Sequence, residues 1–262
     1  MLKGLYVAYT GMIQEQKRMD NLSNNLANVD TTGFKKEGLS SQTFETVLVD
    51  KIKDDSEGYH YAKRIGSANP GVKIGESYVD WSEGSFQVTE VPMDFAIGGK
   101  GFFTVEFTNK AGDTSTFYTR DGNFQMTDEG YLVTTDGDYV LGTGNGGKEH
   151  IKLDPTQEVV VDRQGYIYQD GDVVAQLNMS DFEDYNYLEH YGENFYYPID
   201  GATAKEFEGQ VFQGYLETSN VSVVSEMVEM ISVSRQYEAN QKVIQTYDTS
   251  LQTATQLGRL QG

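Results

Sequence analysis

Residues 222–257 read SVVSEMVEMISVSRQYEANQKVIQTYDTSLQTATQL and contain neither glycine nor proline. Because those two residues are the ones that most often interrupt a helix, this stretch predicts a single helix of roughly 35 residues, about 50 Å long. A seven-residue apolar step favours left-handed packing against another helix. The apolar side chains that follow this step are Val223, Met230, Tyr237, Ile244 and Leu251.

The first thirty residues have the same design and predict a second helix, for which we expect Gly33 to provide the C-cap. Its apolar row is Leu5, Met12, Met19 and Leu26. The companion positions three or four residues away are mostly polar in both helices: Tyr9, Gln16, Ser23, Met227, Ser234, Gln241, Asp248 and Thr255. Such half-polar rows bury too little surface to hold two helices alone, so they favour an interface with further chains. The alternative is that both helices pack on their own domain.

The region between the helices differs in composition. Residues 35–80 are polar and show no sustained period, which predicts a long extended connection. From about residue 82 to 198, apolar and polar residues alternate between reversals at Asp121-Gly122, Glu129-Gly130 and Asp136-Gly137, which is typical of antiparallel strands. The predicted fold class is therefore α+β. A terminal helical coiled-coil domain (1–34 and 213–262) and a mainly antiparallel β domain (81–212) are joined by a linker (35–80).

Charge and composition exclude several classes of function. The chain of 262 residues has 40 acidic and 20 basic residues, a formal charge of −20, which repels phosphate backbones and anionic lipids. We therefore expect no nucleic-acid partner. No stretch is apolar for long enough to span a bilayer, so we expect no insertion into lipid, and the first residues do not resemble a cleaved signal peptide. The absence of cysteine excludes disulfides and thiolate metal sites.

No catalytic, cofactor-binding or metal-binding residues can be assembled from the sequence. The stretch GTGNGGKE (142–149) has the spacing of a phosphate loop, but Glu149 stands where a serine or threonine is needed, so a loop tip is the better interpretation. The three histidines are isolated, and the paired aspartates flank turn glycines. We therefore expect no enzyme. The tyrosine-rich stretch FEDYNYLEHYGENFYYP (182–198) leaves a carbohydrate- or wall-binding surface as an open alternative.

Four stretches of the chain, in order, resemble one family. They are NNLANVDTTGFKK (24–36), VPMDFAIGGKGFF (91–103), YTRDGNFQMTDEGYLVTTDGDYVLG (118–142) and GYLETSNVSVVSEMVEMISVSRQYEANQKVIQTYD (214–248). Together they resemble the bacterial flagellar rod and hook proteins. In its length and its lack of a large inserted outer domain, the chain resembles a rod subunit more than the hook subunit. Among rod subunits, it resembles the distal one more than the proximal one.

This resemblance implies a structural subunit of the flagellar basal body that needs no cofactor. In the family, the two terminal helices pair as a coiled coil and pack against neighbouring copies to form the wall of a hollow tube. The implied partners are other copies of the chain in a helical homopolymer, other rod and hook subunits, and the flagellar type III export apparatus. Export by that apparatus needs no cleaved signal peptide.

The sequence also suggests which residues form the subunit interface. The two apolar rows are expected to join the helices, and their polar companions to face neighbours or the channel. Amide side chains donate and accept hydrogen bonds at once, so those near the end of the first helix are expected to bond adjoining chains. With the residues matched by the family motifs, the further interface candidates are Asn24, Asn25, Asn28, Asp30, Thr32, Gly33, Phe34, Asn220, Arg235 and Asn240.

Overall fold

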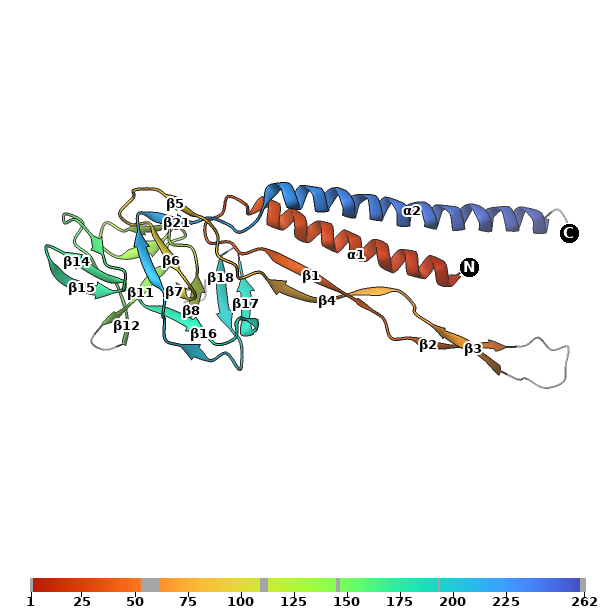
Figure 1. Ribbon diagram of the computed structural model, residues 1–262, viewed down its shortest axis with the longest axis horizontal. Helices are drawn as coiled ribbons and strands as arrows, with labels where there is room; N and C mark the ends of the chain where they lie inside the picture. Colours follow the sequence, from red (N-terminus) through yellow and green to blue (C-terminus); the bar gives the residue numbers. More distant parts are fainter. Residues whose placement is uncertain (1, 53–61, 109–112, 145–146, 193, 260–262) are drawn as a thin grey trace. The chain divides into compact units, whose positions relative to one another are not determined.

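The computed structural model (Figure 1) describes residues 2–52, 62–108, 113–144, 147–192 and 194–259. The chain divides into two compact units, which we call the helical unit and the β unit. The helical unit comprises Met1–Ala27, Glu37–Val79 and Ser222–Gly262. The β unit comprises Asn28–Lys36 and Asp80–Val221.

Two long helices dominate the helical unit. Helix α1 (Leu2–Ala27) and helix α2 (Val223–Arg259) lie side by side and run in opposite directions (Figure 1). The predicted helices at both ends of the chain are confirmed. The predicted C-cap is wrong, because α1 ends six residues before Gly33. The chain leaves the helix through a turn in which the Thr31 amide donates to the Asn28 carbonyl oxygen at 3.3 Å.

Two antiparallel ribbons complete the helical unit. The first pairs β1 (Glu37–Thr43) with β4 (Val72–Val79), and the second pairs β2 (Val47–Ile52) with β3 (Ala62–Ala68). The sequence predicted only an extended connection here and missed the pairing. Strands such as EGLSSQT lack the apolar alternation that burial of one face produces, and none of the described residues of β1 is buried. Residues 53–61 of the predicted linker lie outside the described residues.

The β unit is built on a sheet of ten strands, as far as the described residues show. Its central order is β17-β18-β8-β7-β11-β10-β9, with β12, β16 and β19 attached at its sides, and its pairs are antiparallel. The strands are β7 (Phe102–Thr108), β8 (Thr114–Thr119), β9 (Phe124–Met126), β10 (Leu132–Thr134), β11 (Tyr139–Gly144), β12 (Gly147–His150), β16 (Met179–Phe182), β17 (Leu188–Tyr191), β18 (Phe195–Pro198) and β19 (Ala204–Lys205).

Smaller antiparallel groups surround this sheet. They are β13 (Val160–Val161), β14 (Tyr166–Gln169) and β15 (Asp172–Gln176); β6 (Phe95–Gly98) with β20 (Gln210–Gln213); and β5 (Phe86–Val88) with β21 (Tyr215–Glu217). One 3-10 turn, η1 (Tyr185–Tyr187), precedes β17. The prediction of a central antiparallel β region is therefore confirmed.

The sequence also located several of the reversals. Gly130 and Gly137 adopt φ values of +88° and +95°, as the turn positions require. The stretch GTGNGGKE lies where β11 and β12 form a hairpin, in which Gly144 pairs with Gly147. It is thus a loop tip, as predicted.

The β unit has a dense core. One cluster packs Phe95, Phe103 and Phe124 against aliphatic side chains of the sheet. A second cluster is almost entirely aromatic and includes Phe102 and Tyr196, with Trp81 packed on its edge. Buried aromatic side chains of this size contribute strongly to stability. The β unit therefore contains the core that the sequence assigned to this region.

Candidate functional site

The two helices of the helical unit are in register over three heptads. A side chain at Gly4 would overlap the ring of Tyr247, and one at Gly11 would lie 3.1 Å from the Asn240 amide nitrogen. At the other end, the Asn25 amide nitrogen donates to Glu226 Oε2 at 3.4 Å. Seven residues along α1 towards its C-terminus thus correspond to seven residues along α2 towards its N-terminus. Glycine at two of these positions lets the helices approach closely.

The burial pattern shows which positions lie between the helices. The apolar rows are partly buried, as expected for such positions, except for the exposed Leu251. The other buried or partly buried rows are three residues further on: Ala8, Glu15 and Leu22 in α1, with Glu226, Val233, Asn240 and Tyr247 in α2. The companions Tyr9, Gln16 and Ser23, which were expected to face neighbours or the channel, are exposed. The inner face of each helix therefore follows alternating steps of three and four residues, which a single seven-residue row does not determine.

Polar groups are part of this inner face. Arg18 donates to Glu229 Oε1 at 2.8 Å and to Glu15 Oε2 at 3.4 Å. Burial raises the pKa of the Glu15 carboxyl, and the charge of Arg18 partly offsets this increase. Asn25 is fully buried, donates to the Glu37 carbonyl oxygen at 2.8 Å and accepts from the Glu37 amide at 3.0 Å. Polar pairs between helices fix a register more than they add stability.

The first ribbon covers part of α1. The Gln14 amide nitrogen donates to Ser41 Oγ of β1. A side chain at Gly71, just before β4, would overlap Thr10. Both Thr10 and Gln14 are buried, so α1 is covered by α2 on one side and by the ribbon on another.

Large apolar side chains of the helical unit remain exposed nevertheless. On α2, Val224, Val228 and Ile231 are 73%, 62% and 55% exposed and recur at helical spacing. Further exposed apolar side chains of this unit are Tyr6, Val7, Tyr9, Ile13, Val47, Leu48, Tyr78, Met227, Val243, Leu251 and Leu257. A groove of about 400 Å³ lies beside Val228 and Ile231, and another of about 790 Å³ lies between Tyr6 and Leu48. Exposed apolar surfaces of this kind are typical of sites that bind another protein, a membrane or a ligand.

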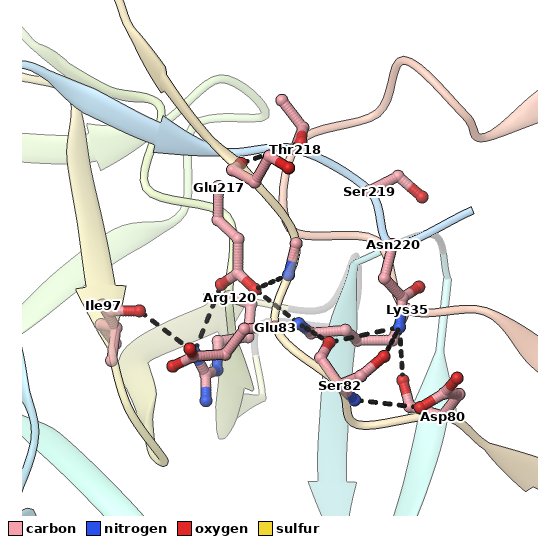
Figure 2. Close-up of polar contacts among 12 residues, drawn as sticks. Lys35, Asp80, Ser82, Glu83, Ile97, Arg120, Glu217, Thr218, Ser219 and Asn220 are labelled. Carbon is pink, nitrogen blue, oxygen red and sulfur yellow. Dashed lines mark hydrogen bonds and ion pairs between the residues drawn. The ribbon is translucent and has the colours of Figure 1, made fainter. Parts of the chain in front are cut away.

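The β unit contains a buried cluster of charged residues (Figure 2). Lys35, Arg120 and Glu217 are only 2%, 3% and 1% exposed. The Lys35 Nζ donates to Glu217 Oε1 at 2.5 Å, and the Arg120 guanidinium donates to Glu217 Oε2 at 3.2 Å. Lys35 lies just after the segment that leaves α1, and Glu217 lies shortly before the segment that enters α2. One carboxylate thus links both of those segments to the sheet.

Backbone groups complete the charge cluster. Lys35 Nζ also donates to the Ser82 carbonyl oxygen at 2.8 Å, and Arg120 Nη2 donates to that of Gly99 at 2.7 Å. Glu217 Oε1 accepts from the Gly84 amide at 3.0 Å. Burial lowers the pKa of Lys35, and the charge of Glu217 opposes this shift. Two buried cations therefore depend on one carboxylate, an arrangement in which loss of a single partner is costly.

Gly33 and Asn220 also hold together the segments that leave α1 and enter α2. The Gly33 amide donates to the Glu217 carbonyl oxygen at 2.8 Å, and Gly33 has a φ of +69° with the backbone of Arg120 and Asp121 where a side chain would lie. Asn220 accepts from the Lys36 amide at 2.7 Å and donates to the Asp80 carbonyl oxygen at 2.8 Å. These polar groups are bonded within the chain.

The predicted interface residues thus fall into three groups. The apolar rows and Asn240 lie along the helix pair, partly buried, except for Leu251, which is exposed. Asn24, Asp30 and Arg235 are exposed, and Asn28 and Thr32 are half-buried. Asn25, Gly33, Phe34 and Asn220 are used within the chain, since Asn25 and Phe34 are buried and the polar groups of the other two bond other segments. Both polar atoms of the Asn25 side chain bond Glu37, and its expected bond to an adjoining chain stays a prediction.

The charge cluster was not predicted from the sequence. Its members occur in GFK, YTR and YLE, where a charged residue follows aromatic or aliphatic ones. Leu216 and Glu217 are consecutive and both buried, although strand alternation predicts that one of them is exposed. A lone charge at the end of an apolar strand is a weak signal. Only three such charges brought together in space identify the cluster.

Comparisons with known proteins agree with this architecture. Family models match residues 5–35 (flagella basal body rod protein), 96–173 (flagellar hook protein FlgE/F/G D1 domain) and 213–257 (flagellar basal body rod FlgEFG protein C-terminal). A flagellar basal-body rod protein FlgG of Buchnera aphidicola (subsp. Schizaphis graminum) is 33% identical over 98% of this chain and 100% of its own length. The FlgG of Bacillus subtilis is 34% identical over 99% of this chain and 100% of its own length.

The chain belongs to the flagellar basal-body rod protein family. This rod protein is a structural component of the bacterial flagellar basal body and not an enzyme. A further relative, the flagellar hook-basal body complex protein FlhO of B. subtilis, is 32% identical over 99% of this chain and 100% of its own length. In the described part of the rod protein, no helix combines the length and the apolar character needed to cross a membrane.

Proposed function

We propose that this rod protein is the distal rod subunit and that it works by polymerising into a hollow helical tube. The tube acts as a driveshaft that transmits torque and as a conduit for exported subunits. Similarity along almost the whole chain to relatives named FlgG supports the assignment. The exposed apolar side chains of the helical unit support polymerisation, because a monomer leaves them in water.

The helix pair is proposed to act as an antiparallel coiled coil. The constant register from Gly4 with Tyr247 to Asn25 with Glu226 supports this, as do the seven-residue apolar rows. Residues 248–257 of α2 continue beyond the stretch paired with α1 and are exposed throughout. A helix of this kind is marginal alone and becomes stable when neighbouring copies bury it, at roughly 25 cal/mol per Å² of apolar surface.

The predicted interface residues are assigned different roles in this proposal. The apolar rows join α1 and α2 within a subunit. The exposed Arg235, together with Val228 and Ile231 on the same groove, faces a neighbouring subunit. Asn24 and Asp30 remain candidates for bonds between subunits. Gly33, Phe34 and Asn220 act inside the subunit, where they fix the segments that lead to the helices.

The two units are assigned different roles in this proposal. The terminal helical domain (1–34 and 213–262) forms the axial core, the β-rich domain (81–212) forms the outer domain, and 35–80 joins them. We assign the charge cluster of Lys35, Arg120 and Glu217 a mechanical role. It holds both segments that adjoin the helices on one sheet, so that torque on the helices reaches the β unit.

The partners follow from this function. They are other copies of the chain, the neighbouring rod and hook subunits, and the flagellar type III export apparatus. The formal charge of −20 supports the expectation of no nucleic-acid partner and no insertion into a bilayer.

A second candidate is the proximal rod subunit, favoured by the similarity to FlhO, and the hook subunit is a more distant third. Deletion of the gene, followed by electron microscopy of purified basal bodies, separates the three. Loss of the distal rod with a normal proximal rod is the expected result. A basal body that has a complete rod and lacks only the hook would contradict it.

A further inference from the structure

The C-terminal end of α2 extends past its partner helix within the helical unit (Figure 1). Gly4 of α1 faces Tyr247 of α2, and α1 begins at Leu2, so residues 248–257 continue beyond the paired stretch. We call these ten residues the overhang, and all of them are exposed. The described part of the chain therefore contains no residue of α1 that faces the overhang in the same register.

The overhang continues the apolar surface of the paired part of α2. Leu251 extends the seven-residue apolar row, and Ala254 lies seven residues after Tyr247, on the row that faces α1. Leu257 follows three residues after Ala254, and residues three apart are neighbours on a helix surface. Leu251 and Leu257 are 41% and 60% exposed. The surface with which α2 packs on α1 is thus continuous with an apolar stripe that lies in water.

A groove of the helical unit has a matching apolar character. It is the groove of about 790 Å³ that lies between α1 and the second ribbon. One wall is the start of α1, from Lys3 to Val7, and the other consists of residues 47–49 and 68–70. Tyr6 and Leu48, one from each wall, are about half exposed. Lys3 is the only charged side chain among the described residues that line the groove.

Contacts within the chain hold the walls of this groove in place. The Gly71 amide donates to Asn69 Oδ1 at 2.9 Å, and the Phe44 amide donates to the Gly71 carbonyl oxygen at 3.1 Å. Gly71 also lies so close to Thr10 of α1 that a side chain at position 71 would overlap it. These contacts fix the turn between β3 and β4 against α1. The groove is therefore formed before a partner binds, which lowers the ordering cost of binding.

The overhang has the features of a helix that binds in a groove. Helices bound in this way use apolar anchors three or four residues apart, which is the spacing from Leu251 to Ala254 and on to Leu257. Asp248, also exposed, precedes Leu251 by three residues and is opposite in charge to Lys3 of the groove. The overhang does not fill the groove of its own chain, because no described residue of α2 lines it.

We propose that the overhang of one subunit packs into the groove of a second copy of the chain. Leu251 and Leu257 are the anchors, and Tyr6 and Leu48 form the walls that receive them. The overhang and the groove are different surfaces, so the contact is heterologous and can repeat from subunit to subunit. This inference rests on the proposed polymerisation and adds which two surfaces of the helical unit meet.

Cysteine cross-linking tests the contact, because the chain has no cysteine of its own. One copy carries Leu48→Cys and a second copy, with a different tag, carries Leu257→Cys. A disulfide that joins the two tags then reports a contact between subunits, since its formation requires Cα atoms within about 7 Å of each other. Purified rods that contain both copies are oxidised and analysed on a non-reducing gel. We expect a product of two chains that carries both tags.

The matched control replaces Leu48→Cys by Val173→Cys, because Val173 is 55% exposed, against 54% for Leu48, and lies in the β unit. The first pair should give at least about tenfold more of the two-tag product than the control pair. Rods that contain both copies but give no more of this product than the control would overturn the proposal. A stronger cross-link between two copies of Leu48→Cys would also overturn it, because that result places one ribbon against another.

A second pair, Tyr6→Cys with Leu251→Cys, probes the other wall of the groove and decides the question if the first pair prevents assembly. The same two-tag product is expected, and its absence from assembled rods would again contradict the proposed contact. Rods that assemble without any such cross-link leave the deletion phenotype, and with it the proposed rod function, untouched. The two proposals can therefore fail separately.

Discussion

The two units of this rod protein differ in which side chains they bury. The β unit packs Phe102, Phe103 and other aromatic side chains into its core and buries even a lysine, an arginine and a glutamate among its own residues. The helical unit leaves apolar side chains such as Val224 and Ile231 in water while it buries Asn25 and Glu226. Side chains such as Val173 are exposed on the β unit as well, but the large buried clusters lie there. We therefore expect the β unit to be stable as a monomer, and we propose that other subunits complete the helical unit.

The largest effect is expected from Glu217→Gln in the β unit. The neutral side chain leaves the buried Lys35 and Arg120 without their shared carboxylate, so the free energy of unfolding of the β unit should fall by about 3–5 kcal/mol. Denaturant unfolding followed by aromatic circular dichroism measures it. The control is Glu158→Gln, an exposed glutamate of the same unit, which should change stability by less than about 0.5 kcal/mol. Similar values for both would show that the cluster is not structural.

A smaller loss is expected from Gly33→Ala. The substitution strains a left-handed φ and pushes a methyl group into the backbone of Arg120 and Asp121, which together should cost about 3 kcal/mol. Gly137→Ala is the matched control, because its φ is +95° and no atom lies within 4 Å of the added carbon. It should cost only about 1–2 kcal/mol. Equal losses would exclude the close approach as the reason for glycine at position 33.

In the helical unit, Asn25→Ala should have a moderate effect. It removes the hydrogen bonds to both backbone groups of Glu37 and to Glu226, at about 1–2 kcal/mol, and should speed hydrogen exchange at the Glu37 amide. Asn24→Ala, one residue earlier and exposed, should leave that amide unchanged. Unaltered exchange in both variants would contradict the internal role of Asn25.

The smallest effect on the monomer is expected from the paired substitution Val228→Ser with Ile231→Ser. Both side chains are exposed, so the stability of the monomer should change by less than about 0.5 kcal/mol, yet rods should not form. The control pair is Val173→Ser with Val174→Ser, equally exposed on the β unit. Cells carrying the control should swim. Normal motility with the α2 pair would show that this face is not a subunit interface.

The sequence predicted the fold class well and the site only in part. The seven-residue rows identified both helices, the absence of glycine and proline supported the second one, and alternation with turn glycines identified the β unit. The ribbons of residues 37–79 were missed because their described strands bury no side chain and so leave no period in the sequence. The buried rows three positions after the apolar ones were not predicted, because a single apolar row does not say whether its partner lies three or four positions away.

The charge cluster could not be predicted from local patterns. Lys35, Arg120 and Glu217 are separated by more than eighty residues, and each taken alone looks like an ordinary surface charge. Their burial depends on how β5, β6, β8 and β21 come together, which is a property of the tertiary structure. Asn25 shows the same limit, since a bond to a neighbouring chain was expected for its amide and the structure shows hydrogen bonds to Glu37.

Hydrogen exchange of the full-length chain, as a dilute monomer and in assembled rods, tests the central claim most directly. In the monomer, we expect slow exchange in the strands β7, β8 and β11 and fast exchange along α1 and α2, because the helical unit lacks the neighbours that bury its apolar side chains. In rods, both helices should become as slow as the strands. Helices protected as strongly as the β unit at low concentration, with no further gain on assembly, would contradict the account.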